Sequence, residues 1–146
     1  MKINFRIATS FDVEKIIELC NYVFEENTDI AYAKKIYEET SDDKNQIYLV
    51  GEVEDKIVAH AKITIIPTIY GKMNTYAILN HVCVHPEYRR HNFATKMLVE
   101  CEKIVKEKGC VCMELWSNNV RVAAHKCYKN YGFVVNDAAF FSKEVK

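Results

Sequence analysis

The sequence predicts a mixed α/β fold in which a single domain spans residues 1–146. Segments with the apolar pattern of β-strands are interleaved with segments whose apolar residues recur at helical spacing. One helical segment stands between two strand-like segments, as in a parallel βαβ crossover. The strands before this crossover follow one another closely enough to form hairpins. We therefore expect a central mixed sheet that is mostly antiparallel, with helices on both of its faces.

The first half of the chain is expected to contain three strands and two helices. Alternating apolar residues at Ile3, Phe5 and Ile7 predict the first strand. Thr9 or Ser10 can cap the helix that follows, because a hydroxyl group accepts from the free N–H groups at a helix start. The elements expected here are a strand over 3–8, a helix over 11–25, a short helix that Asp29 opens, and a hairpin of strands over 46–54 and 56–67.

The second half is expected to contain the crossover, a further helix and a final hairpin. The crossover helix has the strongest apolar stripe in the chain, which includes Phe93, Met97 and Cys101. Gly109 follows this stripe, as expected for a residue that ends a helix. The elements expected here are a strand over 75–84, a helix over 92–108, a strand over 110–117, a helix over 119–130, and a hairpin over 133–145 with Asn136 and Asp137 at its turn.

The charge balance and the hydropathy pattern argue against several classes of protein. Lys and Arg together number 20, as do Asp and Glu, so the formal net charge is zero. A zero net charge argues against general nucleic-acid binding and against electrostatic docking to anionic membranes. There is no apolar run of about 18 residues and no apolar signal-peptide region at the N-terminus. We therefore expect a cytoplasmic protein without nucleic-acid or membrane partners.

The few glycines and the six cysteines limit the chemistry further. Glycines stand only at positions 51, 71, 109 and 132, so neither of the Gly-rich nucleotide-binding fingerprints can be written. The cysteines are expected to be reduced and to act as small apolar side chains. Cys110, Cys112, Cys127 and His125 offer an alternative zinc reading. The one-residue gap between the first two is unlike the usual spacing of zinc ligands, so we expect no metal.

The loop between the strand over 75–84 and the helix over 92–108 is the strongest candidate for a binding site. Free N–H groups and the helix dipole favour an anion at a helix N-terminus, and Arg89 and Arg90 add positive charge there. Asn92 stands where the loop enters the helix, and Asn is one of the few residues that tolerate a positive φ. The alternative is a solvated turn that carries two surface arginines.

Two motifs resemble those of the GNAT superfamily of N-acetyltransferases. The first resembles the acyl-CoA-binding motif Val-x-Pro-x-x-Arg/Gln-x-x-Gly-x-Gly/Ala, and Asn92 replaces the family glycine. Its matching residues are Val84, Pro86, Arg89 and Ala94. Residues 121–133 are similar to the family segment Ala-His-x-x-Tyr-x-x-x-Gly-Phe, and the order of elements along the chain also resembles a GNAT domain.

The resemblance implies an enzyme with acetyl-CoA as its cosubstrate. It implies acetyl transfer to a primary amine by direct attack within a ternary complex, with pantetheine along the strand end and the pyrophosphate against the loop. The residues implied in this binding are Val82, Cys83, Val84, Arg89, Arg90, His91, Asn92, Phe93 and Ala94. Asn118 or Asn119 could bind a pantetheine amide, or could equally cap the helix that follows.

The resemblance also implies a general acid and leaves the general base open. Tyr128 matches the family tyrosine that lies close to the CoA sulfur and protonates the leaving thiolate. The alternative is that Tyr128 hydrogen-bonds the sulfur without transferring a proton. Many relatives place a Glu general base where this chain has Asn80 and His81. His81 and Glu114 are the candidate bases here. A backbone N–H near residues 82–83 is expected to stabilise the oxyanion.

The alternation of a regular strand bears on the role of His81. It places His81 and Cys83 on one face, and Asn80, Val82 and Val84 on the other. His81 is then structural if the face of Asn80 is the active one.

The acceptor is expected to be a small cationic amine rather than a protein. In the family, the loop between the first two helices shapes the acceptor pocket, and here that loop is acidic. Its residues are Glu25, Glu26, Asn27, Thr28 and Asp29. These charges could also form only a solvated surface.

Because a Glu near position 80 is absent and Asn92 replaces glycine, an inactive or weakly active CoA-binding module is the alternative function. A homodimer is compatible with the family.

Overall fold

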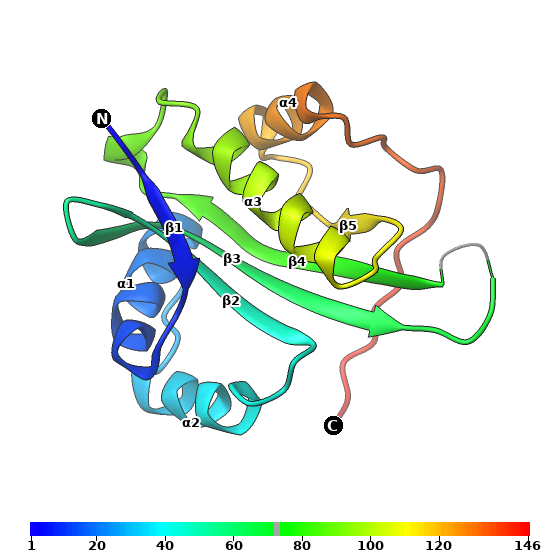
Figure 1. Cartoon of the computed structure of the whole chain (residues 1–146), viewed down its shortest axis with the longest axis horizontal. Coiled ribbons are helices and arrows are strands. Elements are labelled where there is room, and N and C mark those ends of the chain that lie inside the picture. The colour runs from blue at the N-terminus through cyan, green and yellow to red at the C-terminus, as the bar shows by residue number, and fades with distance from the viewer. Residues whose placement is uncertain (72–73) are drawn as a thin grey trace. The chain divides into compact units, whose positions relative to one another are not determined.

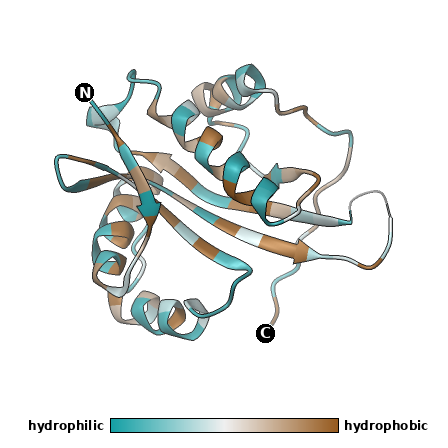
Figure 2. Cartoon of the chain, in the orientation of Figure 1, coloured by the Kyte–Doolittle hydropathy of each residue, from teal (hydrophilic) through white to brown (hydrophobic). Residues whose placement is uncertain are grey.

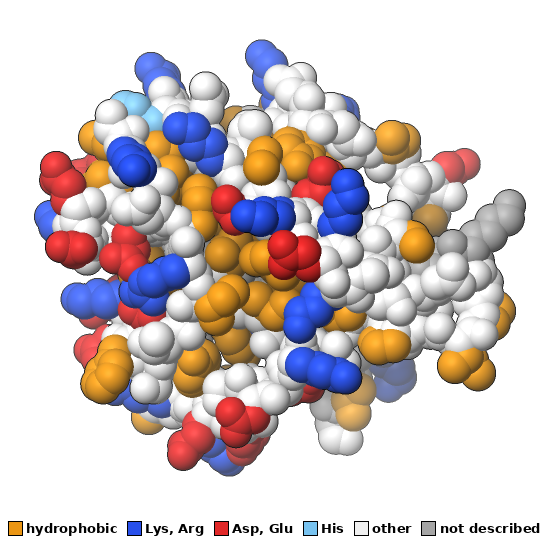
Figure 3. Space-filling view, in the orientation of Figure 1, with side chains coloured by type: hydrophobic (Ala, Val, Ile, Leu, Met, Phe, Trp, Pro, Cys, Tyr) orange, Lys and Arg blue, Asp and Glu red, His pale blue; other side chains and the backbone are white. Residues whose placement is uncertain are grey.

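The computed structural model describes residues 1–71 and 74–146. The chain forms two compact units, Met1–Trp116 and Ser117–Lys146, and each is described by itself below. The expectation of a single domain stays a prediction. No helix in the described ranges is long and apolar enough to cross a membrane. Basic and acidic side chains are interspersed over the face of the molecule seen in Figure 3.

The first unit is built on a five-stranded sheet with the order β1-β2-β3-β4-β5 (Figure 1). The first three pairings are antiparallel, and β4 pairs with β5 in parallel. The strands are β1 (Asn4–Ile7), β2 (Gln46–Val53), β3 (Lys56–Pro67), β4 (Thr75–Val84) and β5 (Met113–Leu115), and the helices of this unit are α1 (Val13–Phe24), α2 (Ile30–Thr40) and α3 (Phe93–Glu107). The predicted mixed sheet and its βαβ crossover are confirmed.

Helices cover both faces of this sheet. On one face, Ile16 of α1 packs against Val50, and the partly buried Cys20 and Tyr48 join them. On the other face, α3 packs against β3 and β4 through a buried stripe at helical spacing. That stripe consists of Phe93, Met97, Leu98, Cys101 and Val105. Hydrophobic residues recur along β2 to β4 and alternate with hydrophilic ones along the helices in Figure 2.

The expected helix boundaries have local chemical causes. The Asp29 carboxylate accepts a hydrogen bond from Tyr32 N at 3.1 Å and so caps α2. Gly109 follows α3 with a φ of +80°, a conformation that glycine adopts without strain. A 3-10 turn at Ser10–Asp12 precedes α1, and the Asp12 carboxylate accepts from Thr9 N at 2.7 Å. The helix predicted over 11–25 is therefore a short turn followed by α1.

A β-bulge interrupts β4 and corrects the predicted alternation. Lys62 pairs with Asn80 and His60 pairs with Cys83, so two residues of β4 lie opposite Ala61 of β3. His81, in the bulge, has a φ of +55°. Paired residues share a face, and Lys62 and His60 are two positions apart, so Asn80 and Cys83 lie on the same face. The prediction that they lie on opposite faces is wrong, because a bulge resets the period of two.

Two other expected strands differ in the structure. The strand predicted over 110–117 is shorter, although Val111 N donates to Thr75 O at 2.9 Å and continues the pairing. The second unit contains α4 (Val122–Tyr131), and residues 132–146 form neither helix nor strand. The hairpin predicted over 133–145 is therefore wrong. Its apolar residues stand in runs of three (133–135) and four (138–141) rather than in alternation, and an isolated hairpin is marginally stable.

Candidate functional site

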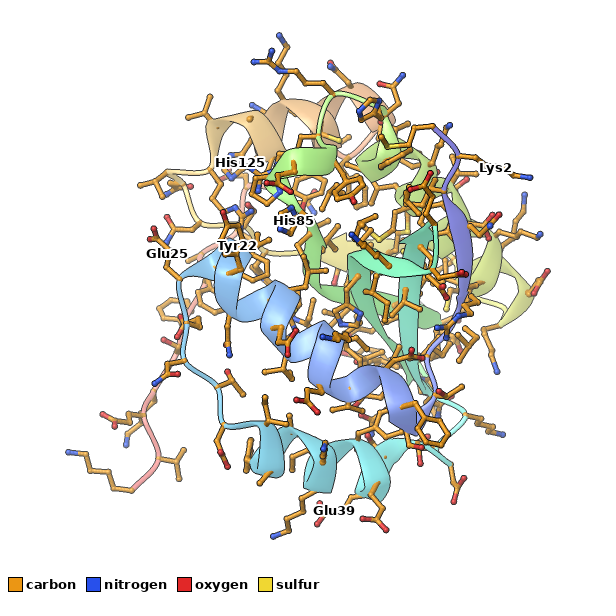
Figure 4. The ribbon with its side chains drawn as sticks, turned by 90° about the vertical axis from the view of Figure 1, so that its left-hand side faces the viewer. Lys2, Tyr22, Glu25, Glu39, His85 and His125 are labelled. Atoms are coloured by element: carbon orange, nitrogen blue, oxygen red, sulfur yellow. The ribbon has the colours of Figure 1, made fainter. Side chains whose placement is uncertain are left out.

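The loop between β4 and α3 is fixed at its start by His85. His85 N donates to Val58 O at 2.7 Å, and His85 Nδ1 accepts from Glu87 N at 3.2 Å. The imidazole also stacks on the ring of Tyr22, with centroids 5.1 Å apart and an interplanar angle of 1°. Figure 4 shows these two side chains next to each other at the end of α1. The loop therefore leaves the strand at a defined position, and a 3-10 turn at Pro86–Tyr88 follows.

The second part of the loop presents free N–H groups at the start of α3. Arg90 has a φ of +68° and Asn92 a φ of +60°, which confirms that Asn92 takes the left-handed conformation. Lys96 N donates to Asn92 O at 2.9 Å and begins the helical pattern. In the described ranges, the N–H groups from Arg90 to Ala94 donate to no protein acceptor. This is the arrangement that binds an anion at a helix N-terminus.

Two arginines add positive charge to this arrangement. Arg89 and Arg90 are both exposed, so their guanidinium groups are accessible to a ligand. Arg89 Nε donates to Val84 O at 3.3 Å, which holds the side chain over the loop. This loop suits a pyrophosphate, because a pyrophosphate needs several N–H donors and neighbouring cations.

The pairing of β4 with β5 stops before the end of β4. β5 pairs with β4 only at Ala77, Ile78 and Leu79. Since β5 ends at Leu115, the ladder between these two strands reaches Leu79 of β4. Backbone groups of the segment 82–84 can therefore accept or donate to an extended ligand, such as the pantetheine arm expected there.

The bulge and β5 bring the two candidate bases to one face. The His81 imidazole is exposed and contacts the Phe24 ring of α1, with centroids 6.4 Å apart. Part of the ring is nevertheless shielded from water, and this partial burial and the Lys62 charge lower the pKa of His81 below its usual value, so its neutral form dominates at neutral pH. Glu114 is half-buried and pairs with Ile78, which shares a face with Asn80 two residues on.

The remaining predicted site residues lie in the second unit. Tyr128 is in α4, and its ring meets that of Phe133 edge-on, with centroids 5.7 Å apart. Asn118 Oδ1 accepts from Val120 N at 3.1 Å, as expected for a residue that caps a turn. Asn119 is exposed. The catalytic role of Tyr128 and the CoA contact of Asn119 stay predictions.

The sequence analysis does not predict a polar strip, formed by Gln46, Lys62 and Asn80, on the face of the sheet that α1 packs against. Lys62 stands at its centre, in β3, where the neighbouring residues are mostly apolar. Its position could have been noticed, because a lysine within an otherwise apolar strand needs a reason. Among the described residues, no group of three or more His, Cys, Asp or Glu side chains is placed to hold a metal ion.

A loop with free N–H groups and arginines, between the carboxyl end of a strand and a helix N-terminus, is typical of proteins that bind a phosphate-bearing molecule. The chain belongs to the GNAT acetyltransferase family: the model described as "Acetyltransferase (GNAT) family" matches residues 12–133. No curated protein matches the chain.

Solved structures show the same fold. A transcriptional regulator from Bacillus halodurans is 19% identical with a TM-score of 0.89, and the alignment covers 98% of this chain and 100% of that one. A predicted acetyltransferase with acetyl-CoA from Clostridium acetobutylicum is 18% identical with a TM-score of 0.82, over 97% and 96% of the two chains. An aminoglycoside acetyltransferase from an uncultured soil metagenomic sample, in complex with sisomicin, is 17% identical with a TM-score of 0.82, over 99% and 97%.

Proposed function

We propose that the protein transfers an acetyl group from acetyl-CoA to a small primary amine, by direct attack within a ternary complex. The observation that carries the proposal is the run of free N–H groups from Arg90 to Ala94, with Arg89 beside it. Neighbours solved with acetyl-CoA or with the amine sisomicin support the same chemistry.

The binding of acetyl-CoA follows from the two parts of the loop region. Its pyrophosphate would accept from the N–H groups of residues 90–94 and be neutralised by Arg89 and Arg90. Its pantetheine arm would lie along the backbone of residues 82–84, beyond the last residue of β4 that pairs with β5. We propose Asn119 as a further donor to a pantetheine amide.

Acetyl-CoA would supply an activated acetyl group, so that a C–N bond to the acceptor forms as the C–S bond breaks. The acceptor amine must lose a proton first, because an alkylammonium has a pKa of about 10. His81 is suited to take that proton, since its lowered pKa keeps the imidazole neutral. Glu114 is the alternative base. A backbone N–H of residues 82–83 would stabilise the oxyanion.

Tyr128 is proposed to return a proton to the leaving thiolate. A phenol with a pKa of about 10 gives its proton uphill to a thiolate whose conjugate acid has a pKa of about 8.5. A local shift or a water relay would be needed to lower this barrier. Tyr128→Phe is then expected to reduce kcat more than it raises KM.

The acidic loop is proposed to attract the ammonium form of the acceptor. Glu25 and Glu26 follow α1 directly and are exposed, and Figure 4 shows Glu25 where that helix ends. Asp29 caps α2 and so has a structural reason to be there. The attraction therefore rests on Glu25 and Glu26.

The decisive experiment combines cosubstrate binding with a panel of amines. Acetyl-CoA should raise the Tm, and at least one primary amine should release free CoA thiol. Binding without any turnover would instead identify a CoA-binding module, and no binding would overturn the proposal. With an active amine, pH–rate profiles of His81→Gln and Glu114→Gln identify the base. If both variants keep the wild-type profile, neither residue is the base.

A further inference from the structure

Lys62 has an environment that suits a cation, but no carboxylate is in direct contact with it. Its Nζ donates to Gln46 Oε1 and to Thr64 Oγ1, both at 3.1 Å, and lies 5.1 Å from the centroid of the Tyr48 ring. In the part of the chain that the structure describes, no carboxylate lies within 4.0 Å of this ammonium. The side chain is half-buried, and burial lowers its pKa, against the opposing effect of the more distant Asp43 carboxylate, which lies behind Gln46.

Keeping a half-buried charge without an ion pair costs free energy. Its neutral partners recover only part of the hydration that the ammonium loses on folding. A Met at this position would keep the packing of the stem without that cost. An anionic ligand would supply the ion pair that the ammonium lacks.

The surroundings of Lys62 are open to a ligand. Tyr48 lies directly across from it on β2, and Asn80 directly across on β4. β4 is an interior strand, and yet Asn80 and the adjacent His81 are exposed, so solvent reaches this part of the face beside α1. Directly paired residues have Cβ atoms about 5 Å apart. A small molecule with one end at His81 would therefore reach Lys62 with the other.

We propose that Lys62 binds a carboxylate of the acceptor, so that the substrate is a small primary amine that also carries an acid group, such as a free amino acid. This inference rests on the proposed function and narrows it. The ammonium of Lys62 would attract the carboxylate, with the side-chain amide of Asn80 as a second donor. The acceptor amine would then lie toward His81. Polyamines and aminoglycosides would meet like charge at Lys62.

Matched amine pairs that differ only by a carboxylate test this inference. Lysine with cadaverine, histidine with histamine, and tyrosine with tyramine are assayed for kcat/KM by CoA thiol release, together with spermidine and sisomicin. We expect at least one amino acid to exceed its decarboxylated partner by tenfold or more. Lys62→Met should reduce that ratio by about 10- to 100-fold, the range for losing a hydrogen bond to a charged group.

Controls separate a binding role from a structural one. Lys56→Met makes the same change at an exposed lysine at the start of β3 and should leave the ratio unchanged. Lys62→Met should not lower the Tm, because it removes a half-buried charge. Lys62→Gln provides a second neutral variant and should lose the same preference, whereas Lys62→Arg should keep most of it.

Three results would overturn the inference. The first is better turnover of the decarboxylated amines, spermidine or sisomicin by the wild type. The second is an unchanged ratio in Lys62→Met and Lys62→Gln. Both leave the proposed acetyl transfer intact. The third is a complete absence of turnover with every amine, which overturns the proposed function and this inference with it.

Discussion

The most sharply defined prediction concerns the response of stability to acid at His60. This side chain is 3% exposed, and its Nδ1 lies 2.8 Å from Leu49 O. A carbonyl oxygen only accepts, so Nδ1 carries the hydrogen. Burial, followed by the charges of His81 and Lys62, lowers the pKa of His60 from 6.5 to about 4, against the opposing effect of the Leu49 carbonyl.

The sign and size of the effect follow from proton linkage. The folded-state pKa is below the unfolded one, so between these values the unfolded chain binds a proton that the folded chain excludes. Stability is therefore lost as the pH falls. With pKa values of 6.5 and about 4, the loss is about 2 kcal/mol near pH 5 and about 3 kcal/mol near pH 4.

Urea unfolding of the wild type and of His60→Asn, at several pH values between 7 and 4, measures this loss. The Asn amide can donate to Leu49 O as Nδ1 does but does not titrate in this range. The variant should start less stable at pH 7 and lose less on acidification, so the two free-energy curves should converge. Parallel curves would refute the reasoning, because the loss would then come from other groups.

Three further predictions concern single positions. The Asp12 carboxylate accepts hydrogen bonds from Arg6 Nη1 at 2.7 Å, from Arg6 Nη2 at 2.9 Å and from Thr9 N at 2.7 Å. Asp12→Asn weakens these contacts and should lower the free energy of unfolding, measured in urea, by about 1–3 kcal/mol. The pKa of this carboxyl is lowered to about 2, so the wild type should lose this advantage as the pH falls from 4 toward 2. Gly51→Ala should cost about 1–3 kcal/mol in thermal melts, because its Cβ would stand 2.8 Å from Ile3 Cδ1 and 2.9 Å from Phe5 Cε1; an unchanged Tm would mean that both side chains move aside freely. Asn92→Gly should bind CoA equally well or better in calorimetry, since glycine adopts a positive φ without strain; a tenfold loss would assign a role to the amide side chain.

Much of the sheet could be predicted because its signals are local. The hairpin expected over 46–54 and 56–67 forms as β2 and β3, and the strand over 75–84 forms with the same bounds as β4. The apolar pattern, together with the short turn at Glu54 and Asp55, carries this information. The loop before α3 could be found for the same reason, since a helix start and two arginines are visible in the chain.

The bulge and the polar strip could not be predicted, because they depend on pairing between strands. Nothing in the sequence of β4 indicates that His81 has a positive φ. The bulge that gives it this conformation becomes visible only in the register of β4 against β3. Gln46, Lys62 and Asn80 are far apart in the chain and become neighbours only through that register. The hairpin expected over 133–145 does not form, although Asn136 and Asp137 are typical turn residues. A turn sequence alone does not hold two strands together without a neighbouring strand to pair with.

The bulge at His81 also determines which substitutions β4 tolerates. Before it, Leu79 faces the interior and Asn80 is exposed, and after it both Cys83 and Val84 are buried. A saturation scan of β4 should therefore show that polar residues are accepted at even-numbered positions up to 80. After the bulge this alternation should be lost, because the consecutive positions 83 and 84 should both require apolar residues. Deleting Val82 would restore regular pairing with β3 and give a more regular strand. It would also place His81 opposite Ala61, without its left-handed conformation and on the other face of the sheet from Asn80. Selection for a more stable strand and selection for activity would therefore favour different sequences at this point.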